Sequence, residues 1–409
     1  MQRSDGTAWT LDTLFVHGEK HSRTTGLTGV PSVQPIYAST TYLHQNAEAL
    51  DQAFEKGSGS EGEGTAYVYG RQGNPSMQGL EAVMTQAEGG VGAVTFGSGM
   101  AAIHAALLAA GLVTGCKIVA GQDMYGATVA LLRQMFVPMG VEVVLLDLCG
   151  PHAADLIRAE QPDVVYVETL SNPLVKLIDL KAISAASAKV GAVSIIDSTM
   201  TTPYLLRPIV YGFDMVVHSA TKYLGGHGDS TAGVVVSAKK TLLDALRNCA
   251  TLMGAMLSPF EAHLIKRGLQ TLPLRMERHC RNAIQVAHFL SEHPAVARVH
   301  YPGLPGHPQY ALATALLDRG LYGGMLSFEL QAQSRQAVMR FMDKLNLCLP
   351  ATTLGDAWSL VSYPPMSSHR TLSASDRKKM GITEGCIRLS VGIEDVEDII
   401  GDLDQALEG

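Results

Sequence analysis

The sequence lacks the features of a membrane protein or a nucleic-acid-binding protein. No window approaches the ~18 uninterrupted apolar residues of a membrane span. Residues 1–15 lack the apolar core of a secretory signal peptide. The 31 basic residues are outnumbered by 38 acidic ones and form no long basic run. We therefore expect neither a membrane nor a nucleic acid as a partner.

Cysteine is scarce as well. The six cysteines stand far apart and form no C-x-x-C pair, so we expect neither a metal site nor a disulfide framework. Free thiols of this kind indicate a reducing cytoplasm. What the chain does have is 46% hydrophobic and only 17% charged residues over 409 positions, which indicates a globular protein of two or three well-cored domains.

Seven short apolar segments indicate buried β-strands. They are rich in Val and Ile, are apolar on successive positions, and alternate with helical stretches such as 100–112 and 127–136. Strands that are buried on both faces have this composition. The segments are GAVTFGS (92–98), KIVAG (117–121), VEVVLLD (141–147), DVVYVET (163–169), AVSIIDS (192–198), MVVHSA (215–220) and AGVVVSA (232–238). This alternation predicts an α/β domain with a mostly parallel sheet.

The remaining segments predict an arm and a second domain. Residues 1–72 show little periodicity, and the run GSGSEGEGT (57–65) is typical of a loop. We therefore expect an arm that lies on a neighbouring subunit and adds no core element. Residues 73–262 would form the α/β domain. Residues 263–409 contain a long helical stretch interrupted near Pro273, then strand patterns and a closing helix, which predicts a smaller α+β domain.

Three strand ends carry polar residues that could form one site, because ligands in open α/β sheets bind beyond the carboxyl ends of the strands. The turn GSGM (97–100) leads into a helix whose free N–H groups favour an anion, although a plain strand-to-helix turn would look the same. Asp197 ends a buried strand, where a carboxylate needs a cation unless it caps a helix. Lys222 follows another strand, where desolvation would lower its pKa unless it is a solvated loop lysine.

Together these strand ends supply the parts of a pyridoxal 5'-phosphate (PLP) site. The lysine would form an imine with the cofactor, and the aspartate would keep the pyridine nitrogen protonated. The helix N-terminus, with Ser219 and Thr221, would hold the phosphate. The turn at 97–100 does not match G-x-G-x-x-G, and the chain has no G-x-x-x-x-G-K-[ST], so nucleotide sites lose support. We therefore predict a PLP enzyme with Lys222 as its cofactor lysine.

The chain resembles the Cys/Met-metabolism family of PLP-dependent enzymes over residues 12–407. This family includes cystathionine γ-synthase, cystathionine γ-lyase, methionine γ-lyase and the O-acylhomoserine sulfhydrylases. The matching motifs are YGRQGNP (69–75), FGSGMAA (96–102), ETLSNP (168–173), DSTMTTPYL (197–205), SATKYLGGHGD (219–229) and IRLSVGIED (387–395). The resemblance implies fold type I of the PLP transferases, with a large, mostly parallel seven-stranded sheet domain, a smaller α+β C-terminal domain and an N-terminal arm. It also implies a homotetramer with shared active sites and a small amino acid as substrate.

The resemblance implies a role for each matching residue. Lys222, Tyr125 and Asp197 would be catalytic, with the lysine moving protons and the tyrosine stacking on the cofactor ring. The cofactor-binding residues would be Tyr69, Arg71, Gly99, Met100, Tyr125, Asn172, Asp197, Thr199, Ser219, Thr221 and Lys222. Tyr69 and Arg71 would reach the phosphate in a neighbouring subunit. Arg388, with Ser359, would hold the substrate α-carboxylate. Alternatively, Tyr125 is a packed core aromatic and Arg388 belongs to a surface ion pair.

Four positions depart from the family pattern and bear on the substrate. Ala127 replaces a cysteine of the methionine γ-lyases, and Ala250 and Thr251 replace their Lys-Asp pair, which argues against ordinary methionine γ-lyase activity. Trp358 replaces a glutamate that is frequent in members that handle cystathionine. A tryptophan cannot accept a hydrogen bond, but its face attracts cations. We hypothesise a γ-substituted substrate with a flat, apolar or delocalised cationic far end, such as the guanidinooxy group of canavanine; alternatively Trp358 only fills space.

The expected reaction is γ-elimination on a sulfur- or oxygen-substituted amino acid. The stretches RMERHCRNA (275–283) and GITEG (381–385) are closer to the γ-lyase branch than to the synthases. Other readings are γ-replacement, as in cystathionine γ-synthase or an O-acylhomoserine sulfhydrylase, and a β-lyase. Outside the enzymes, a catalytically silent PLP-binding homologue would lack a catalytic group, but Lys222, Asp197 and Arg388 are all present.

Overall fold

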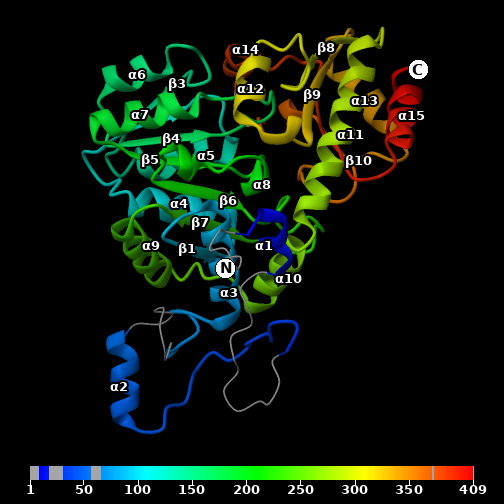
Figure 1. Ribbon diagram of the computed structural model, residues 1–409. Helices are drawn as coiled ribbons and strands as arrows, with labels where there is room; N and C mark the ends of the chain where they lie inside the picture. The colour runs from blue at the N-terminus through cyan, green and yellow to red at the C-terminus, as the bar shows by residue number, and fades with distance from the viewer. Residues whose placement is uncertain (1–8, 18–30, 57–65, 371–372, 409) are drawn as a thin grey trace.

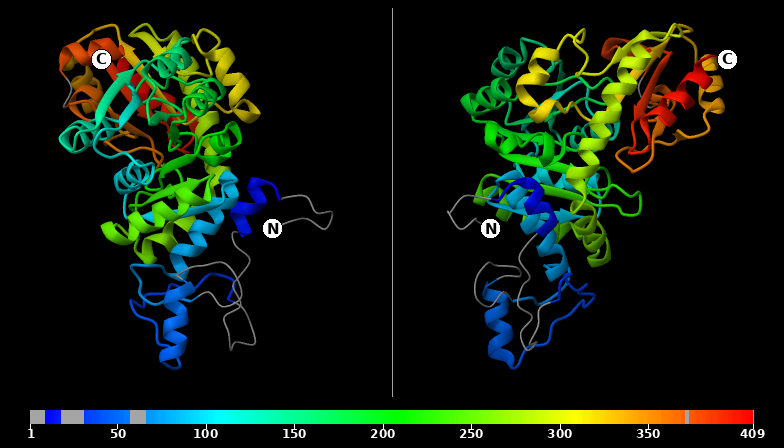
Figure 2. Two further views of the ribbon diagram at one scale, coloured as in Figure 1. Left: turned by 90° about the vertical axis from the view of Figure 1, so that its left-hand side faces the viewer. Right: turned by 45° about the vertical axis from the view of Figure 1, so that its right-hand side comes forward.

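The computed structural model describes residues 9–17, 31–56, 66–370 and 373–408. A large part is built around a seven-stranded sheet and a smaller part around a five-stranded sheet (Figure 1). Residues 31–56 belong to an arm that projects away from both (Figures 1 and 2). The glycine-rich run predicted as a loop, 57–65, lies outside the described residues.

The large sheet contains the seven strands that were predicted. They are β1 (Gly92–Phe96), β2 (Lys117–Gly121), β3 (Glu142–Leu146), β4 (Val164–Glu168), β5 (Val193–Asp197), β6 (Met215–Ser219) and β7 (Gly233–Ser237). Their order in space is β1-β7-β6-β5-β4-β2-β3, and β7 alone among them runs against the others. The predicted mostly parallel seven-stranded sheet is therefore confirmed.

Helices cover both faces of this sheet. One face packs against α3 (Pro75–Glu88), α6 (Ala153–Glu160), α7 (Leu180–Val190) and α10 (Pro259–Leu269). The other packs against α4 (Gly99–Ala109), α5 (Gly126–Leu131), the π-helical turn η1 (Leu132–Phe136) and α9 (Lys240–Met253). The short turns α8 (Thr202–Leu205) and η2 (Pro208–Tyr211) follow β5. In β4, Val165 and Val167 belong to the first core and Val164 and Tyr166 to the second, so both faces are apolar and no polar alternation is visible in the sequence.

The C-terminal part is a mostly antiparallel sheet packed against helices. Its strands are β8 (Val296–His300), β9 (Met325–Leu330), β10 (Leu349–Pro350), β11 (Leu360–Ser362) and β12 (Cys386–Ser390), in the order β10-β11-β12-β9-β8, and β10 alone pairs in parallel. Its helices are α11 (Leu272–Glu292), α12 (Tyr310–Leu316), α13 (Arg335–Lys344), α14 (Ala374–Met380) and α15 (Val396–Leu407), with 3-10 turns η3 (Asp318–Gly320) and η4 (Pro364–Met366). The long helix α11 contacts β8, β9 and α15. The predicted helix interruption lies at 270–271, and Pro273 stands in the first turn of α11, where no hydrogen bond is lost.

Two sequence expectations concern the whole chain. In the part of the chain that the structure describes, no helix combines the length and the apolar character that a membrane crossing needs. All six cysteines are free, and three of them are buried.

The expectation that the arm adds no core element is wrong for its first helix, α1 (Leu11–His17). Leu14 and Phe15 are buried in the main core, and α1 contacts α3 and α11. Leu11, Leu14 and Phe15 stand at the i, i+3 and i+4 positions of one helix face. The helix is only seven residues long, so its periodicity was too short to be recognised. Helix α2 (Ala47–Lys56) of the projecting arm does lie apart from the core, as predicted (Figure 1).

Replacing Phe15, which is 1% exposed, with alanine tests whether α1 belongs to the core. We expect the Phe15→Ala variant to lose about 3 kcal/mol of unfolding free energy, because a buried ring is replaced by a cavity. Its neighbour Val16 is exposed on the same helix, so Val16→Ala should cost about 0.5 kcal/mol or less. Denaturant titration of the two variants measures both values. Equal, small losses would show that α1 is only loosely attached.

Candidate active site

A cavity of about 260 Å³ lies at the carboxyl ends of β4, β5 and β6. Its lining residues are Ser98, Gly99, Met100, Ile103, Tyr125, Glu168, Asn172, Asp197, Thr199, Met200, Ser219, Thr221, Lys222, Thr231, Thr352, Leu354 and Arg388. The predicted site residues that are missing from this lining are Tyr69, Arg71, Trp358 and Ser359. The turn at 97–100, Asp197 and Lys222 all line this cavity, so the structure brings the three predicted strand ends together.

The turn after β1 forms an anion-binding corner. Ser98 caps α4, and its hydroxyl accepts a hydrogen bond from the Ala101 N–H at 3.1 Å. The N–H groups of Gly99 and Met100 are in the first turn and have no partner within the helix. A Cβ atom on Gly99 would lie 2.8 Å from the Ser219 Cβ, so glycine lets this helix end approach β6 closely. The helix dipole and the Ser219 hydroxyl thus meet in one corner of the cavity.

Asp197 is fixed at the end of β5 by local hydrogen bonds. Its Oδ1 accepts from the Thr199 N–H at 2.9 Å and from the Thr199 hydroxyl at 2.5 Å. Burial raises the pKa of Asp197, and the Thr199 hydrogen bonds and the charge of His218 oppose that shift. The cavity would therefore favour a cationic ligand group that compensates the carboxylate.

Lys222 is partly buried, so the reading as a solvated loop lysine is wrong. Its ammonium donates a hydrogen bond to the Thr353 hydroxyl at 2.7 Å. Burial lowers the pKa of Lys222, the positive charge of Arg388 lowers it further, and Asp356 acts in the opposite direction. A larger share of the amine is therefore unprotonated near neutral pH than for an exposed lysine, which suits a nucleophile or base.

Arg388 is 3% exposed, so its reading as a surface ion pair is also wrong. Its neighbours Ile387 and Leu389 join the main core, and alternation along β12 turns Arg388 to the other face. Its Nη2 donates to the Thr353 carbonyl at 2.9 Å, and its Nη1 donates to Asn172 Oδ1 at 3.3 Å. Its Nε has no partner among the described residues. Burial lowers the pKa of Arg388 to about 10, so it stays cationic and can accept an anionic ligand.

Tyr125 and Glu168 form a further contact in the cavity. The Tyr125 N–H donates to Glu168 Oε1 at 2.6 Å, and the Tyr125 side chain is 41% exposed, which contradicts its reading as a packed core aromatic. Glu168 ends β4 and stands opposite Asp197 in the strand register. Sequence reasoning missed Glu168 as a site residue, although it ends its strand as Asp197 does. The hydroxyl-bearing Thr231, Thr352 and Thr353 were also missed, since no strand or motif marks them.

The four predicted residues outside the cavity have other contacts. Tyr69 lies in the arm beneath the guanidinium of Arg71, which donates to the Thr251 carbonyl at 2.7 Å. The Ser359 hydroxyl donates to Glu394 Oε2 at 3.1 Å and accepts from the Gly392 N–H. Its expected role beside Arg388 in holding the substrate carboxylate stays a prediction. Trp358 is 41% exposed.

One group of potential metal ligands occurs among the described residues. Asp123, Asp147 and Cys149 have ligand atoms within 4.8 Å of one another. The ammonium of Lys176 forms an ion pair with Asp123 at 2.9 Å, and its positive charge competes with a cation at this place. We assign no metal to this group.

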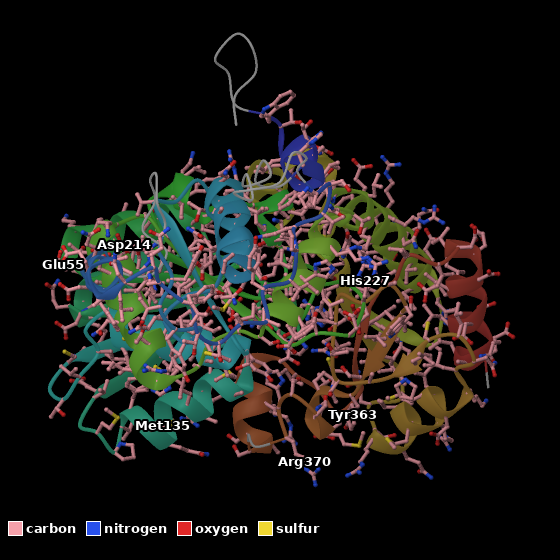
Figure 3. All side chains as sticks on the ribbon, turned by 90° about the horizontal axis from the view of Figure 1, so that it is seen from below. Glu55, Met135, Asp214, His227, Tyr363 and Arg370 are labelled. Carbon is pink, nitrogen blue, oxygen red and sulfur yellow. The ribbon has the colours of Figure 1, made fainter. Side chains whose placement is uncertain are left out.

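The orientation of β6 explains why the C-terminal part closes the cavity. Asp214 directly precedes β6 and His227 follows Lys222, and the two lie far apart in Figure 3. His227 lies on the side of the C-terminal elements, which are drawn in gold to red (Figure 3). Ser219, which ends β6, and Lys222 line the same cavity as Thr352, Leu354 and Arg388 of the C-terminal part.

The geometry matches a known class of proteins, the fold type I PLP enzymes. The family described as Cys/Met metabolism PLP-dependent enzyme matches residues 12–408. The L-methionine gamma-lyase of Porphyromonas gingivalis is 41% identical over 376 residues, which are 91% of this chain and 92% of the relative. The cystathionine gamma-lyase of Bacillus subtilis is 38% identical over 401 residues, which are 97% and 98% of the two chains. A crystal structure of cystathionine gamma synthase from Xanthomonas oryzae pv. oryzae, in complex with aminoacrylate and cysteine, has a TM-score of 0.89 at 34% identity and covers 98% of both chains.

The chain therefore belongs to the Cys/Met-metabolism family of PLP-dependent enzymes, and its cofactor is pyridoxal 5'-phosphate. The cavity fits this group. Asp197 would meet the cationic ring nitrogen, the N-terminus of α4 with Ser219 would meet the phosphate, and Lys222 would form the covalent link. When bound, PLP supplies an electron sink that makes the Cα proton of an amino acid acidic. The Nε of Arg388 has no hydrogen-bond partner among the described residues and would be free to bind a substrate carboxylate.

Replacing Arg388 with glutamine tests this last assignment. We expect KM for the amino-acid substrate to rise about 100-fold, because the substrate carboxylate loses a buried charged partner. The visible absorbance of the bound cofactor should persist, since Lys222 and Asp197 are untouched. Arg298→Gln, on the exposed edge of the same sheet, is the control and should leave KM unchanged. An unaltered KM in Arg388→Gln would contradict the assignment.

Proposed function

We propose that the protein catalyses γ-elimination, in which an amino acid with a leaving group on Cγ reacts with one water molecule to give 2-oxobutanoate, ammonia and the protonated leaving group. The observation that carries this proposal is the buried guanidinium of Arg388, whose Nε has no partner, in the same cavity as Lys222 and Asp197. A cation for a carboxylate, a base with a lowered pKa and a carboxylate for a ring nitrogen are the groups that an α-amino acid and PLP together require.

Each residue would have a defined part in the reaction. Arg388 would hold the α-carboxylate so that Cα lies near Lys222. The Lys222 amine would take the Cα proton and then a Cβ proton, because burial keeps part of it unprotonated. The Tyr125 hydroxyl would give a proton to the departing γ-group, and its ring would stack on the cofactor. Asn172, which accepts a hydrogen bond from Arg388, would lie beside the ring hydroxyl.

Elimination is favoured over replacement by the names of the sequence relatives. Both relatives described above are named γ-lyases, whereas the similar crystal structure is named a synthase. Ala127, Ala250 and Thr251 still argue against ordinary methionine as the substrate. Replacement of the γ-group by a thiol is the second candidate, because both reactions share the early proton transfers.

The far end of the substrate would be a delocalised cation, as in the guanidinooxy group of canavanine. Trp358 supplies an exposed aromatic face. A Cβ atom on Gly228 would lie 3.1 Å from Trp358 Cζ2 and 3.3 Å from Asp356 Oδ2, so the indole edge and a carboxylate flank the same point. A planar cation is attracted by both groups.

The assembly and the location stay proposals as well. We propose a homotetramer in which Tyr69 and Arg71 of the arm complete a neighbouring active site, since neither lines the cavity of its own chain. We propose the domain limits 1–72, 73–262 and 263–409. The end of the large sheet at Ser237 and the start of the small one at Val296 support a second limit between them, and the limit at 262 falls within α10. A cytoplasmic location is supported by the six free thiols.

A substrate panel tests the reaction. The purified enzyme with its visible cofactor absorbance would be given methionine, cystathionine, homocysteine, canavanine, and O-acetyl- and O-succinylhomoserine without a nucleophile. We expect one of these γ-substituted compounds to yield 2-oxobutanoate and ammonia, and Lys222→Ala to yield none. Homoserine in place of 2-oxobutanoate would show that water replaces the γ-group. Turnover that requires an added thiol would establish replacement instead. Pyruvate from cystathionine would establish a β-lyase.

Replacing Trp358 with alanine or glutamate tests the cationic far end. We expect KM for canavanine to rise about tenfold in Trp358→Ala, because a cation–aromatic contact contributes roughly 1–2 kcal/mol. KM for the uncharged O-acetylhomoserine should change much less. Trp9 is also an exposed tryptophan, so Trp9→Ala is the matched control and should leave KM unchanged. Unchanged kinetics and substrate preference in both Trp358 variants would show that Trp358 only fills space.

A further inference from the structure

Glu168 has no part in the reaction described so far, although its side chain lines the cavity. It ends β4, and its Cα is paired with that of Asp197 at the end of β5. Two carboxyl groups therefore stand on neighbouring strands at the same edge of the sheet and face the same space. A site that needs one anion for a cationic ring nitrogen does not need two.

Glu168 also makes a specific contact with Tyr125. Its Oε1 accepts the Tyr125 N–H at 2.6 Å. Tyr125 occupies the N-cap position of α5, and its own side chain makes no capping hydrogen bond. The contact ties the loop between β2 and α5 to the end of β4. It thereby limits where the Tyr125 ring can lie over the cavity.

The surroundings of Glu168 favour its neutral form. Two acidic side chains interact electrostatically with Glu168, namely Asp197 on β5 and Asp123 in the loop before α5. The other titratable groups near it are Cys149, Tyr166 and Tyr125. None of these groups is a cation. Burial raises the pKa of Glu168 well above its usual value, and the negative charge of Asp197 raises it further. Two carboxylates this close in a buried site cannot both ionise at low cost.

We propose that Glu168 is a positioning residue that holds Tyr125 over the cavity by accepting its backbone N–H, and that it acts as a neutral carboxylic acid. Asp197 is then the single carboxylate anion available to the cationic ring nitrogen. A neutral acid keeps its carbonyl oxygen as a hydrogen-bond acceptor, so the contact with Tyr125 does not depend on a charge. The proposal rests on the cofactor site of the proposed function, but not on the identity of the substrate.

Glu168→Gln and Glu168→Ala separate the two parts of this proposal. Glutamine keeps a carbonyl acceptor at the same reach and has no charge, so the dissociation constant of PLP and its visible circular dichroism should stay within about threefold of the wild-type values. Alanine leaves the Tyr125 N–H without its acceptor, and PLP binding should weaken about tenfold or more. In Glu168→Ala, kcat should fall at least tenfold while KM changes little, because Arg388 still holds the carboxylate.

A double variant tests whether Glu168 acts through Tyr125. The combined Glu168→Ala, Tyr125→Ala protein should bind PLP no more weakly than Tyr125→Ala alone, because residues that act as a unit are not additive. Thermal unfolding without PLP checks that each variant is folded. Glu160→Gln, which removes a carboxylate paired with Lys117 at the surface, is the control and should change neither binding nor circular dichroism.

Two results would overturn the proposal. If Glu168→Gln weakens PLP binding as much as Glu168→Ala, the carboxylate must be an anion. If neither variant alters binding or circular dichroism, other contacts hold Tyr125. PLP binding and circular dichroism are measured without a substrate, so a failure of the γ-elimination assay would leave these readings intact.

Discussion

The burial of Arg388 is the constraint on which the site depends. Its guanidinium comes from the small sheet, yet it donates to Asn172 of the large part and to the carbonyls of Thr352 and Thr353. A buried cation without a carboxylate partner is costly, and carbonyl and amide oxygens compensate only part of that cost. The Nε of Arg388 has no hydrogen-bond partner among the described residues, so a ligand anion is stabilised most by binding at that atom. Ser327, also on the small sheet, donates to the Pro173 carbonyl at 2.6 Å and reinforces the same junction.

The charges in the cavity are separated by their origin in the fold. The acids Glu168 and Asp197 and the amine of Lys222 follow neighbouring strands of the large sheet, whereas Arg388 comes from β12 of the small sheet. Burial and the charge of Asp197 raise the pKa of Glu168, and burial and the charge of Arg388 lower the pKa of Lys222. The protonation states of the site follow from this arrangement, because Lys222 can lose its proton and Glu168 can keep its proton.

The arm has two distinct structural relations to the rest of the chain. Helix α1 adds Leu14 and Phe15 to the core of its own chain, which anchors the start of the arm. At its other end Arg71 donates to the Thr251 carbonyl of α9 and lies over the Tyr69 ring, and neither residue lines the cavity of its own chain. This arrangement supports the proposal that the arm contributes residues to a neighbouring subunit.

The sequence by itself determined the sheet and most of the cavity lining. Strands buried on both faces require unbroken Val- and Ile-rich runs, so all seven strands of the large sheet were predicted within one or two residues of their ends. Lys222, Asp197 and the glycine turn follow such strands directly, and parallel strands bring their carboxyl ends together whatever the details of packing. The family motifs added Tyr125, Asn172 and Arg388, which chain position alone does not place near the sheet.

Only the tertiary structure decided which groups these residues contact. The sequence predicted a role for Ser359 toward the substrate carboxylate, but it could not predict that its hydroxyl bonds Glu394 and the Gly392 N–H, because these partners lie more than 30 residues away in sequence. Glu168 was missed because its acceptor role depends on the loop that carries Tyr125. Helix α1 was missed because a seven-residue helix is stable only through the surface on which it packs. Periodicity records which face of an element is buried, whereas hydrogen-bond partners depend on how separate elements pack in space.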